Sequence, residues 1–437
     1  MSTLAVPLAV YLLSRHGLFA VIGFAVVAPL VVFTLPGVTA MLVAPVVSAL
    51  LLAHVFPDAA TPAVGGALAA LVLGMLVHIC AGTARLRREH AAIVLLVVVL
   101  GVSLLFPAVP LHPTASPTYD LIGMLEGLIL LSAALAAPPS PRRLAQVVAL
   151  TGAVEGTYAL VRGLYVDGRL VSDTLNPNYL GAALVVPAIA AIGLAWTDRR
   201  PLWLLAALPT LAALVATRSR GAMVAVVAGL LVQAVVHLRR LRGKALIAAA
   251  AAATLLATGA LTVVQQFALG GRSTEELSTN NEIRADAARF ALHVALDNPG
   301  RGIGYGMFAP YAGLHSPQHV VINTHNDYLR LAVEAGVVAL LLFAYLLWRG
   351  LRALRTPEYT VLGAVVVAYA VGLLFANTLS NLIVTAPFWV ALGALTGNAA
   401  ARRGKGRHRQ NSASSTIAST DWLKARTPGS PPTAAGQ

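Results

Sequence analysis

Three short polar motifs interrupt an otherwise apolar chain, and the first combines two arginines with a glycine. Thr217-Arg218-Ser219-Arg220-Gly221 lies between two closely spaced apolar stretches. The planar guanidinium of arginine can bind two phosphate oxygens at once, and Gly221 would let a ligand or another backbone come close. The motif therefore predicts an anion site with Arg220 as its main contact and Arg218 beside it. For Arg218, contact with lipid headgroups is an equally good interpretation.

The second motif is an arginine in a long polar segment of the chain. Arg284 occurs early in residues 282–296, whose apolar residues recur at helical spacing. Asn298-Pro299-Gly300 would end this helix. We expect Arg284 to contact phosphate, although an exposed ion pair with a neighbouring acidic residue would also explain it. Arg289 lies on another face of the helix and Arg301 follows the turn, so both rank below Arg284 as substrate contacts.

The third motif places a histidine at the expected start of a helix. Within residues 323–328, Thr324 and Asp327 have the spacing of a capping box, which predicts a helix beginning at His325. A helix N-terminus disfavours the imidazolium, so His325 would stay neutral and could accept a proton. Free N–H groups at the same point could bind an anion. A purely structural histidine is the alternative.

Three further polar residues are candidate substrate contacts: Asn326, Tyr328 and Asn178, which opens another apolar stretch. Metal ligands are not expected, because the spacing of His325 with two nearby histidines fits no standard zinc pattern. The chain also contains no Asp-x-Asp pair that could hold a metal-bound nucleotide sugar. The glycines of residues 302–306 resemble a phosphate loop in number only, since no strand precedes them. We therefore expect neither a metal nor a cofactor.

Membrane-spanning helices must position these motifs. Apolar residues make up 58% of the 437 residues and charged residues 11%, whereas soluble domains contain about 25% charged residues. This composition excludes soluble enzymes, coiled coils and collagen-like chains, and the single cysteine excludes an internal disulfide. A span needs about 20 mostly apolar residues. The apolar stretches therefore predict an all-α polytopic membrane protein with about 12 transmembrane helices.

Short basic clusters between the apolar stretches indicate the topology. They account for much of the formal net charge of +14, and by the positive-inside rule they are cytoplasmic, as are both chain termini. Because the clusters punctuate spans and do not form one face, we expect membrane lipids and no nucleic acid as partners. The three motifs then share the opposite, outer side of the membrane.

The chain divides into four regions. Residues 1–267 hold about nine or ten spans, and residues 268–330 form a large outer loop with amphipathic helices. Residues 331–397 hold the last spans, and residues 398–437 form a disordered basic cytoplasmic tail. A loop as long as 268–330 beside a membrane is usually functional.

In order and spacing, these motifs resemble the bacterial O-antigen ligase and polymerase family of polyprenyl-diphosphate-dependent glycosyltransferases. The resemblance covers roughly residues 175–340 and rests on a set of short motifs: Ser219-Arg220-Gly221-Ala222, the helix with Arg284, Asn298-Pro299 followed by Gly302-Ile303-Gly304-Tyr305-Gly306, His325-Asn326-Asp327-Tyr328-Leu329, and Glu334-Ala335-Gly336. Arg301 departs from the pattern, because an apolar residue is expected before the glycine turn. The resemblance implies a GT-C-like fold with its large loop in the periplasm.

The resemblance also implies a reaction. An O-antigen chain would pass from undecaprenyl diphosphate to a terminal sugar of the lipid A–core oligosaccharide, at the periplasmic face of the bacterial inner membrane, without metal or nucleotide. The family's essential arginines and histidine would map onto Arg220, Arg284 and His325. The arginines would hold the diphosphate and stabilise the leaving group. His325 would take the proton of the acceptor hydroxyl, with inversion at the anomeric carbon.

Three alternatives stay open. An O-antigen polymerase would use the same donor but extend another lipid-linked glycan, and a protein O-oligosaccharyltransferase would modify serine or threonine. A secondary transporter or lipid flippase belongs to a different class and would place its charges near the bilayer midplane, at broken helices. The candidate charges of this chain gather at one membrane face instead, which favours the enzyme.

Overall fold

The computed structural model describes residues 15–43, 57–84, 86–110, 117–238, 274–317, 319 and 321–398. The predicted span at residues 245–267 lies outside the described residues, and so does the predicted tail at residues 398–437, apart from Asn398. Within the described part of the chain, the only strands are two short ones that form a hairpin.

The prediction of an all-α polytopic membrane protein is confirmed. Among the residues that the structure describes, seven helices are long and apolar enough to cross a membrane. Four shorter apolar helices accompany them: Gly17–Phe33, Leu202–Ala216, Thr360–Gly372 and Leu382–Asn398. A total of about 12 spans stays a prediction.

The first half of the chain forms two groups of helices. The N-terminal group consists of α2 (Arg15–Phe33), α3 (Leu35–Met41), α5 (Pro57–Cys80), α6 (Arg88–Leu105) and α7 (Pro117–Ala136). The second group consists of α8 (Pro141–Arg162), α9 (Pro177–Asp198), α10 (Leu202–Ala216) and α11 (Arg220–Leu238). Between α8 and α9, strand β1 (Leu164–Val166) pairs antiparallel with β2 (Arg169–Val171).

The second half of the chain joins these groups. It contains α13 (Thr274–Asp297), α14 (Phe308–His315), α15 (Asp327–Leu351), two 3₁₀ turns (Arg352–Arg355 and Pro357–Tyr359), α16 (Thr360–Gly372) and the final helix Leu382–Asn398. Helix α16 packs against α9 and α11, whereas α15 packs against α6. Helix α9 is the most buried of these seven long apolar helices, because 78% of its apolar 18-residue stretch is buried inside the protein.

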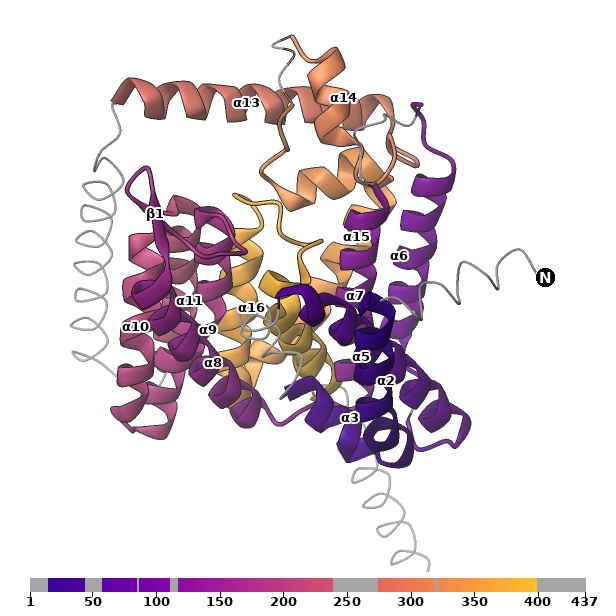
Figure 1. Cartoon of the computed structure of the whole chain (residues 1–437), viewed down its shortest axis with the longest axis vertical. Coiled ribbons are helices and arrows are strands. Elements are labelled where there is room, and N and C mark those ends of the chain that lie inside the picture. Colours follow the sequence, from indigo (N-terminus) through magenta and orange to yellow (C-terminus); the bar gives the residue numbers. More distant parts are fainter. Residues whose placement is uncertain are drawn as a thin grey trace, which may run out of the picture.

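One end of the helix bundle carries the non-spanning elements. Figure 1 shows α13 running across this end, with α14 and the β1 hairpin on the same side of the bundle. All three polar motifs lie at this end, since Arg284 is within α13 and the other two motifs stand at the starts of α11 and α15. We call this the α13 end of the bundle.

Helix α13 forms because its apolar residues share one face. The sequence predicts a helix over residues 282–296, and the structure extends it to Thr274–Asp297. Ala287 and Val294 are buried, as expected for that face. Val294 packs in a small core separate from the main one, together with other residues of α13, the glycine segment, α14 and α15: Ala291, Ile303, Met307, Phe308, Ala312 and Val333. This core attaches α13 to the top of α15.

Candidate active site

The His325 motif forms a cap that differs from the predicted one. Helix α15 begins at Asp327, not at His325, and its N-cap is Asn326. The Asn326 side-chain oxygen accepts hydrogen bonds from the backbone N–H groups of Tyr328 at 3.0 Å and Leu329 at 3.1 Å. The prediction of a Thr324 cap is therefore wrong, because asparagine is at least as good a cap as threonine and stands two residues later.

His325 lies just before this cap in a left-handed backbone conformation, with φ of 48°. Its side chain is half-buried. Burial, and in second place the positive charge of Arg284, lower the pKa of His325 to about 4. The imidazole is therefore neutral at pH 7 and can accept a proton. Neutrality agrees with the sequence prediction, but its cause is burial and Arg284, not the helix N-terminus.

The structure thus brings two of the three predicted catalytic residues together. Helix α13 packs against α15, and the charge of Arg284 acts on the His325 ring across this contact. Arg284 itself is half-buried. This pairing of a neutral imidazole with a cation suits a site that takes a proton next to a bound anion.

The arginine motif between α10 and α11 lies against the β hairpin. Arg218 has a φ of 52°, and its guanidinium lies beside Gly168 in the hairpin turn, where an added Cβ would sit 3.1 Å from Nη1. Arg169 of the hairpin donates to the carbonyl of Thr217 at 3.0 Å and to Oδ1 of Asn178 at 2.8 Å. The hairpin therefore fixes the turn that ends at Arg220, and Asn178 is part of this scaffold.

Gly221 lets another part of the protein come close. A Cβ added there would lie 2.6 Å from the Cβ of Phe375. Phe375 belongs to the connection between α16 and the final helix, residues 373–381, which we call the 373–381 connection. The Arg220 motif is therefore packed against the 373–381 connection, which the sequence patterns did not single out.

The same connection holds the start of α15. The carbonyl of Leu373 accepts a hydrogen bond from the N–H of Asp327 at 2.8 Å. The buried Asp327 carboxylate accepts from the N–H groups of Thr378 at 2.6 Å and Leu379 at 3.1 Å. Asn377 donates to the Thr324 hydroxyl at 3.0 Å. The 373–381 connection thus touches both the Arg220 and the His325 motifs, and its polar residues are the signal that could have revealed it.

The remaining predicted contacts are either exposed or have partners within the protein. Arg289 is exposed and forms an ion pair with Asp286 at 3.0 Å, and Arg301 is exposed in the turn after α13. The Tyr328 hydroxyl donates to the carbonyl of Ala370 at 2.7 Å. Tyr328 and the N-cap Asn326 therefore have structural partners. Any role of these residues toward a substrate stays a prediction.

The glycine segment at residues 302–306 binds a carboxylate of the protein itself. The Glu334 carboxylate accepts hydrogen bonds from the N–H groups of Gly306 and Phe308, both at 3.0 Å. Gly302, Gly304 and Gly306 all have positive φ, a conformation that glycine adopts without strain. The glycines therefore allow this segment to pack on α15. This packing accounts for the three glycines, and no nucleotide-binding role is needed to explain them.

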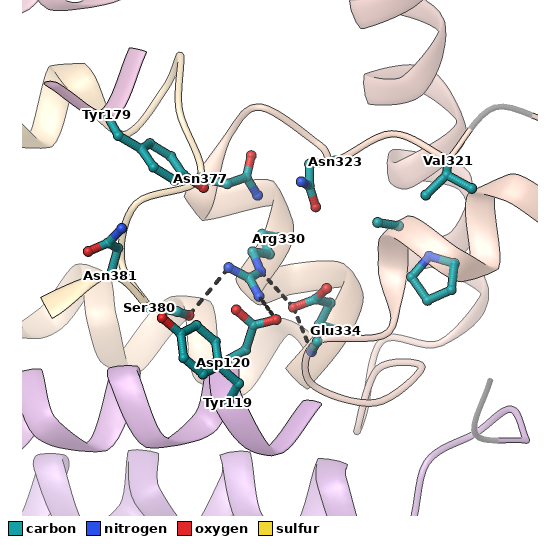
Figure 2. Close-up of a pocket in the computed structure, with 13 residues that line it drawn as sticks. Tyr119, Asp120, Tyr179, Val321, Asn323, Arg330, Glu334, Asn377, Ser380 and Asn381 are labelled. Atoms are coloured by element: carbon teal, nitrogen blue, oxygen red, sulfur yellow. Dashed lines mark hydrogen bonds and ion pairs between the residues drawn. The ribbon is translucent and has the colours of Figure 1, made fainter. Parts of the chain in front are cut away.

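Beside Glu334 lies a buried arginine that sequence reasoning did not single out. Arg330 pairs with the Asp120 carboxylate at 2.9 Å and with Glu334 at 2.8 Å, and it donates to the Ser380 hydroxyl at 3.3 Å. Its guanidinium also stacks over the Tyr305 ring, 5.2 Å from the centroid. Figure 2 shows Asp120, Glu334 and Ser380 around the guanidinium. The four-residue spacing of Arg330 and Glu334 on an apolar helix is the signal that was available.

Above this ion-pair network is a polar cavity of about 360 Å³. Its walls come from α7, α9, the glycine segment, α14, the segment that leads into α15, the first turns of α15 and the 373–381 connection. The lining residues are Tyr119, Asp120, Tyr179, Gly306, Ala309, Pro310, Val321, Asn323, Arg330, Glu334, Asn377, Ser380 and Asn381 (Figure 2). His325 is two residues from Asn323 in this lining.

The central part of the chain is similar to a known protein family. Residues 204–344 match a family model described as O-antigen ligase. The match supports assigning this part of the chain to the O-antigen ligase family. The O-antigen ligase region includes Arg220, Arg284, His325 and Arg330, whereas the cavity walls from α7, α9 and the 373–381 connection lie outside it. A comparison with curated proteins gives no match.

Proposed function

We propose that this protein transfers an O-antigen glycan from undecaprenyl diphosphate to the lipid A–core oligosaccharide, at the periplasmic face of the bacterial inner membrane. The O-antigen ligase match over residues 204–344 supports a glycosyltransferase acting on a polyprenyl-linked glycan. The observation that carries the proposal is the half-buried His325 near Arg284: burial, and in second place the charge of Arg284, lower the pKa of the imidazole.

In the proposed reaction, an acceptor hydroxyl oxygen attacks the anomeric carbon of the donor glycan. The bond between that carbon and the diphosphate oxygen breaks, and undecaprenyl diphosphate leaves with the electron pair. His325 takes the proton of the attacking hydroxyl. Arg220 and Arg284 hold the diphosphate and stabilise the charge that develops on it. A single displacement of this kind inverts the anomeric configuration.

Binding of the donor diphosphate would also raise the pKa of His325. The charge of Arg284 lowers the pKa of His325, and a bound diphosphate would offset that charge. The imidazole then becomes a better proton acceptor when the donor is present. Proton removal from water in the absence of donor is disfavoured by the same arrangement.

The test is transfer in a purified system. Undecaprenyl-diphosphate-linked O-antigen is mixed with lipid A–core and EDTA, for the wild type, His325→Ala and the control His315→Ala. His315 lies at the end of α14, stacked on Tyr311, so its variant should transfer normally. We expect a ladder of modified lipid A–core from the wild type and the control, and none from His325→Ala.

Other outcomes would reassign the protein. Longer lipid-linked glycan with unmodified lipid A–core would indicate a polymerase, and glycan on an added acceptor protein would indicate a protein O-oligosaccharyltransferase. No product of any kind from a folded wild-type protein would favour a transporter or flippase. Normal transfer by a folded His325→Ala protein would remove His325 from the mechanism.

A further inference from the structure

The polar cavity above Arg330 has no part in the mechanism proposed so far. Its volume of about 360 Å³ falls within the range of about 300–1,000 Å³ that is typical of small-molecule sites. It adjoins the His325 motif through Asn323. The charges and hydrogen-bonding groups of its lining residues therefore indicate the kind of ligand that it would bind.

The charges in the cavity are unfavourable for a phosphate. Arg330 is the only basic residue of the lining, and its Nε, Nη1 and Nη2 groups are engaged by Glu334, Ser380 and Asp120 respectively. Two carboxylates against one guanidinium leave the lining with a net negative charge. An anionic ligand would face this charge without a free cation to bind it.

The free hydrogen-bonding groups of the lining belong to amides and phenols. Among the described residues, the side chains of Tyr119, Tyr179, Asn323 and Asn381 have no hydrogen-bond partner, although all four line the cavity. An amide both donates and accepts hydrogen bonds, and so does a phenol. Groups of this kind match a ligand rich in hydroxyls, and the aromatic rings offer it apolar surface.

We propose that this cavity binds an uncharged sugar ring of the glycan substrates, held by Asn323, Asn381 and Tyr119, and that the Arg330 network excludes acidic sugars from it. The inference rests on the proposed glycosyl transfer for its biological meaning. The ring belongs either to the end of the acceptor or to the first sugar of the donor. Asn323 and Asn381 act as specificity-determining residues, and the ion-paired Arg330 acts by positioning Asp120 and Glu334.

Ligand-observed NMR on the full-length protein in nanodiscs tests the proposal without any transfer step. The probes are methyl β-glucoside and methyl β-glucuronide, which differ only in a hydroxymethyl and a carboxylate group. We expect saturation transfer to the glucoside and binding at least about tenfold weaker for the glucuronide. Asn323→Ala and Asn381→Ala should each weaken glucoside binding about three- to tenfold.

Two further variants keep the result interpretable. Tyr119 is 71% exposed, so Tyr119→Phe removes one hydroxyl without disturbing a core and should also weaken binding. Asn398→Ala is the matched control, because Asn398 hydrogen-bonds to Pro139 and Ala394 away from the cavity. Equal binding of both probes, glucoside binding that survives all three lining variants, or no glucoside binding to folded protein would overturn the proposal.

Kinetics separate the two sources of the sugar and the two proposals. In a transfer assay, a higher KM for lipid A–core in Asn381→Ala identifies the acceptor as the source, and a higher KM for the lipid-linked glycan identifies the donor. If glucoside binding behaves as expected while no glycan is transferred, the sugar site stands and the ligase function fails. If transfer occurs but the probes do not bind, the reverse holds.

Discussion

His325 combines an unusual backbone conformation with a lowered pKa. Its φ of 48° is uncommon for any residue with a side chain, although histidine is enriched there. The Asn326 cap and the hydrogen bond from Asn377 to Thr324 hold the segment on both sides. Strained residues fixed in this way often occur at functional sites, which agrees with the role proposed for the imidazole.

The first prediction concerns the pH dependence of transfer. His325 must be neutral to accept a proton, so activity should be present above its pKa and lost below it. We expect the low-pH limb of kcat/KM near pH 4. Arg284→Gln removes one cause of the lowered pKa, and should move this limb upward, toward the ordinary value of 6.5. Arg289→Gln, on the exposed face of the same helix, should leave it in place; an unmoved limb in Arg284→Gln would contradict the assignment.

The second prediction concerns the buried Arg330. Its side chain is only 8% exposed, and Arg330→Met would leave two carboxylates without their counter-ion. Breaking one side of a buried ion network costs about 3–5 kcal/mol, so we expect a marked drop in Tm by thermal unfolding in detergent. Arg289→Met breaks an exposed pair and should cost about 0–1 kcal/mol. Similar Tm values for the two variants would show that the network contributes little to stability.

At the scale of elements, α15 is the helix on which the site depends. It carries the cap, Arg330 and Glu334, and it is interrupted at Gly336, where φ is 84°. The glycine segment fills the interruption: Ile303 donates to the carbonyl of Val333 at 2.9 Å, and Val337 donates to that of Pro299, also at 2.9 Å. The loop and the helix therefore form one hydrogen-bonded unit.

Two neighbouring glycines give the third prediction. Gly302 has a φ of 69°, and a Cβ added there would lie 2.4 Å from the Glu334 backbone, whereas a Cβ at Gly300 would meet nothing within 4 Å. Gly302→Ala should therefore lose at least about 1–3 kcal/mol of stability. Gly300→Ala should stay within about 0.5 kcal/mol of the wild type. Thermal unfolding and limited proteolysis of residues 298–308 measure the difference, and equal behaviour would refute the close approach.

Local patterns predicted some of these elements and could not predict others. The apolar spacing of α13 indicated the helix and its end at residue 298, because periodicity and Pro-Gly signals are local. The start of α15 was misplaced by two residues, because Thr324 and Asn326 compete for the same cap. The pairing of Arg330 with Asp120 spans more than two hundred residues, and so it depends on how α7 and α15 pack. The role of the 373–381 connection was missed for the same reason.

At the scale of the whole molecule, the α13 end differs in chemistry from the opposite end. The α13 end holds the cavity and the three polar motifs. The opposite end holds the basic connection at residues 142–143 and 199–200, and there Arg142 pairs with Asp198 at 3.0 Å. A pair of the partly buried Arg349 and the buried Glu89 links α15 to α6 near that end. The positive-inside rule predicts that this is the cytoplasmic end.

The fourth prediction tests that orientation. In a Cys80→Ser background, Arg289→Cys should react with a membrane-impermeant maleimide in intact cells with a permeabilised outer membrane. Arg143→Cys, which is also exposed, should react only after the inner membrane is opened. Arg289 and Arg143 lie in the described helices α13 and α8. The reverse pattern would place the cavity in the cytoplasm and exclude a periplasmic reaction.

The break in α15 also bears on how the protein is made. A membrane span with unpaired backbone N–H and C=O groups is costly in lipid. In α15, residues 299–304 supply the hydrogen-bonding partners that the break leaves missing. These residues leave the ribosome before residues 333–337, with which they pair. The predicted topology exports residues 299–304. We therefore expect them to stay at the translocon exit and to form their hydrogen bonds with α15 as that helix enters the bilayer. Chains truncated after residue 351 should therefore insert α15 less efficiently when residues 299–304 are replaced by a flexible linker, and equal insertion would show that the span needs no such partner.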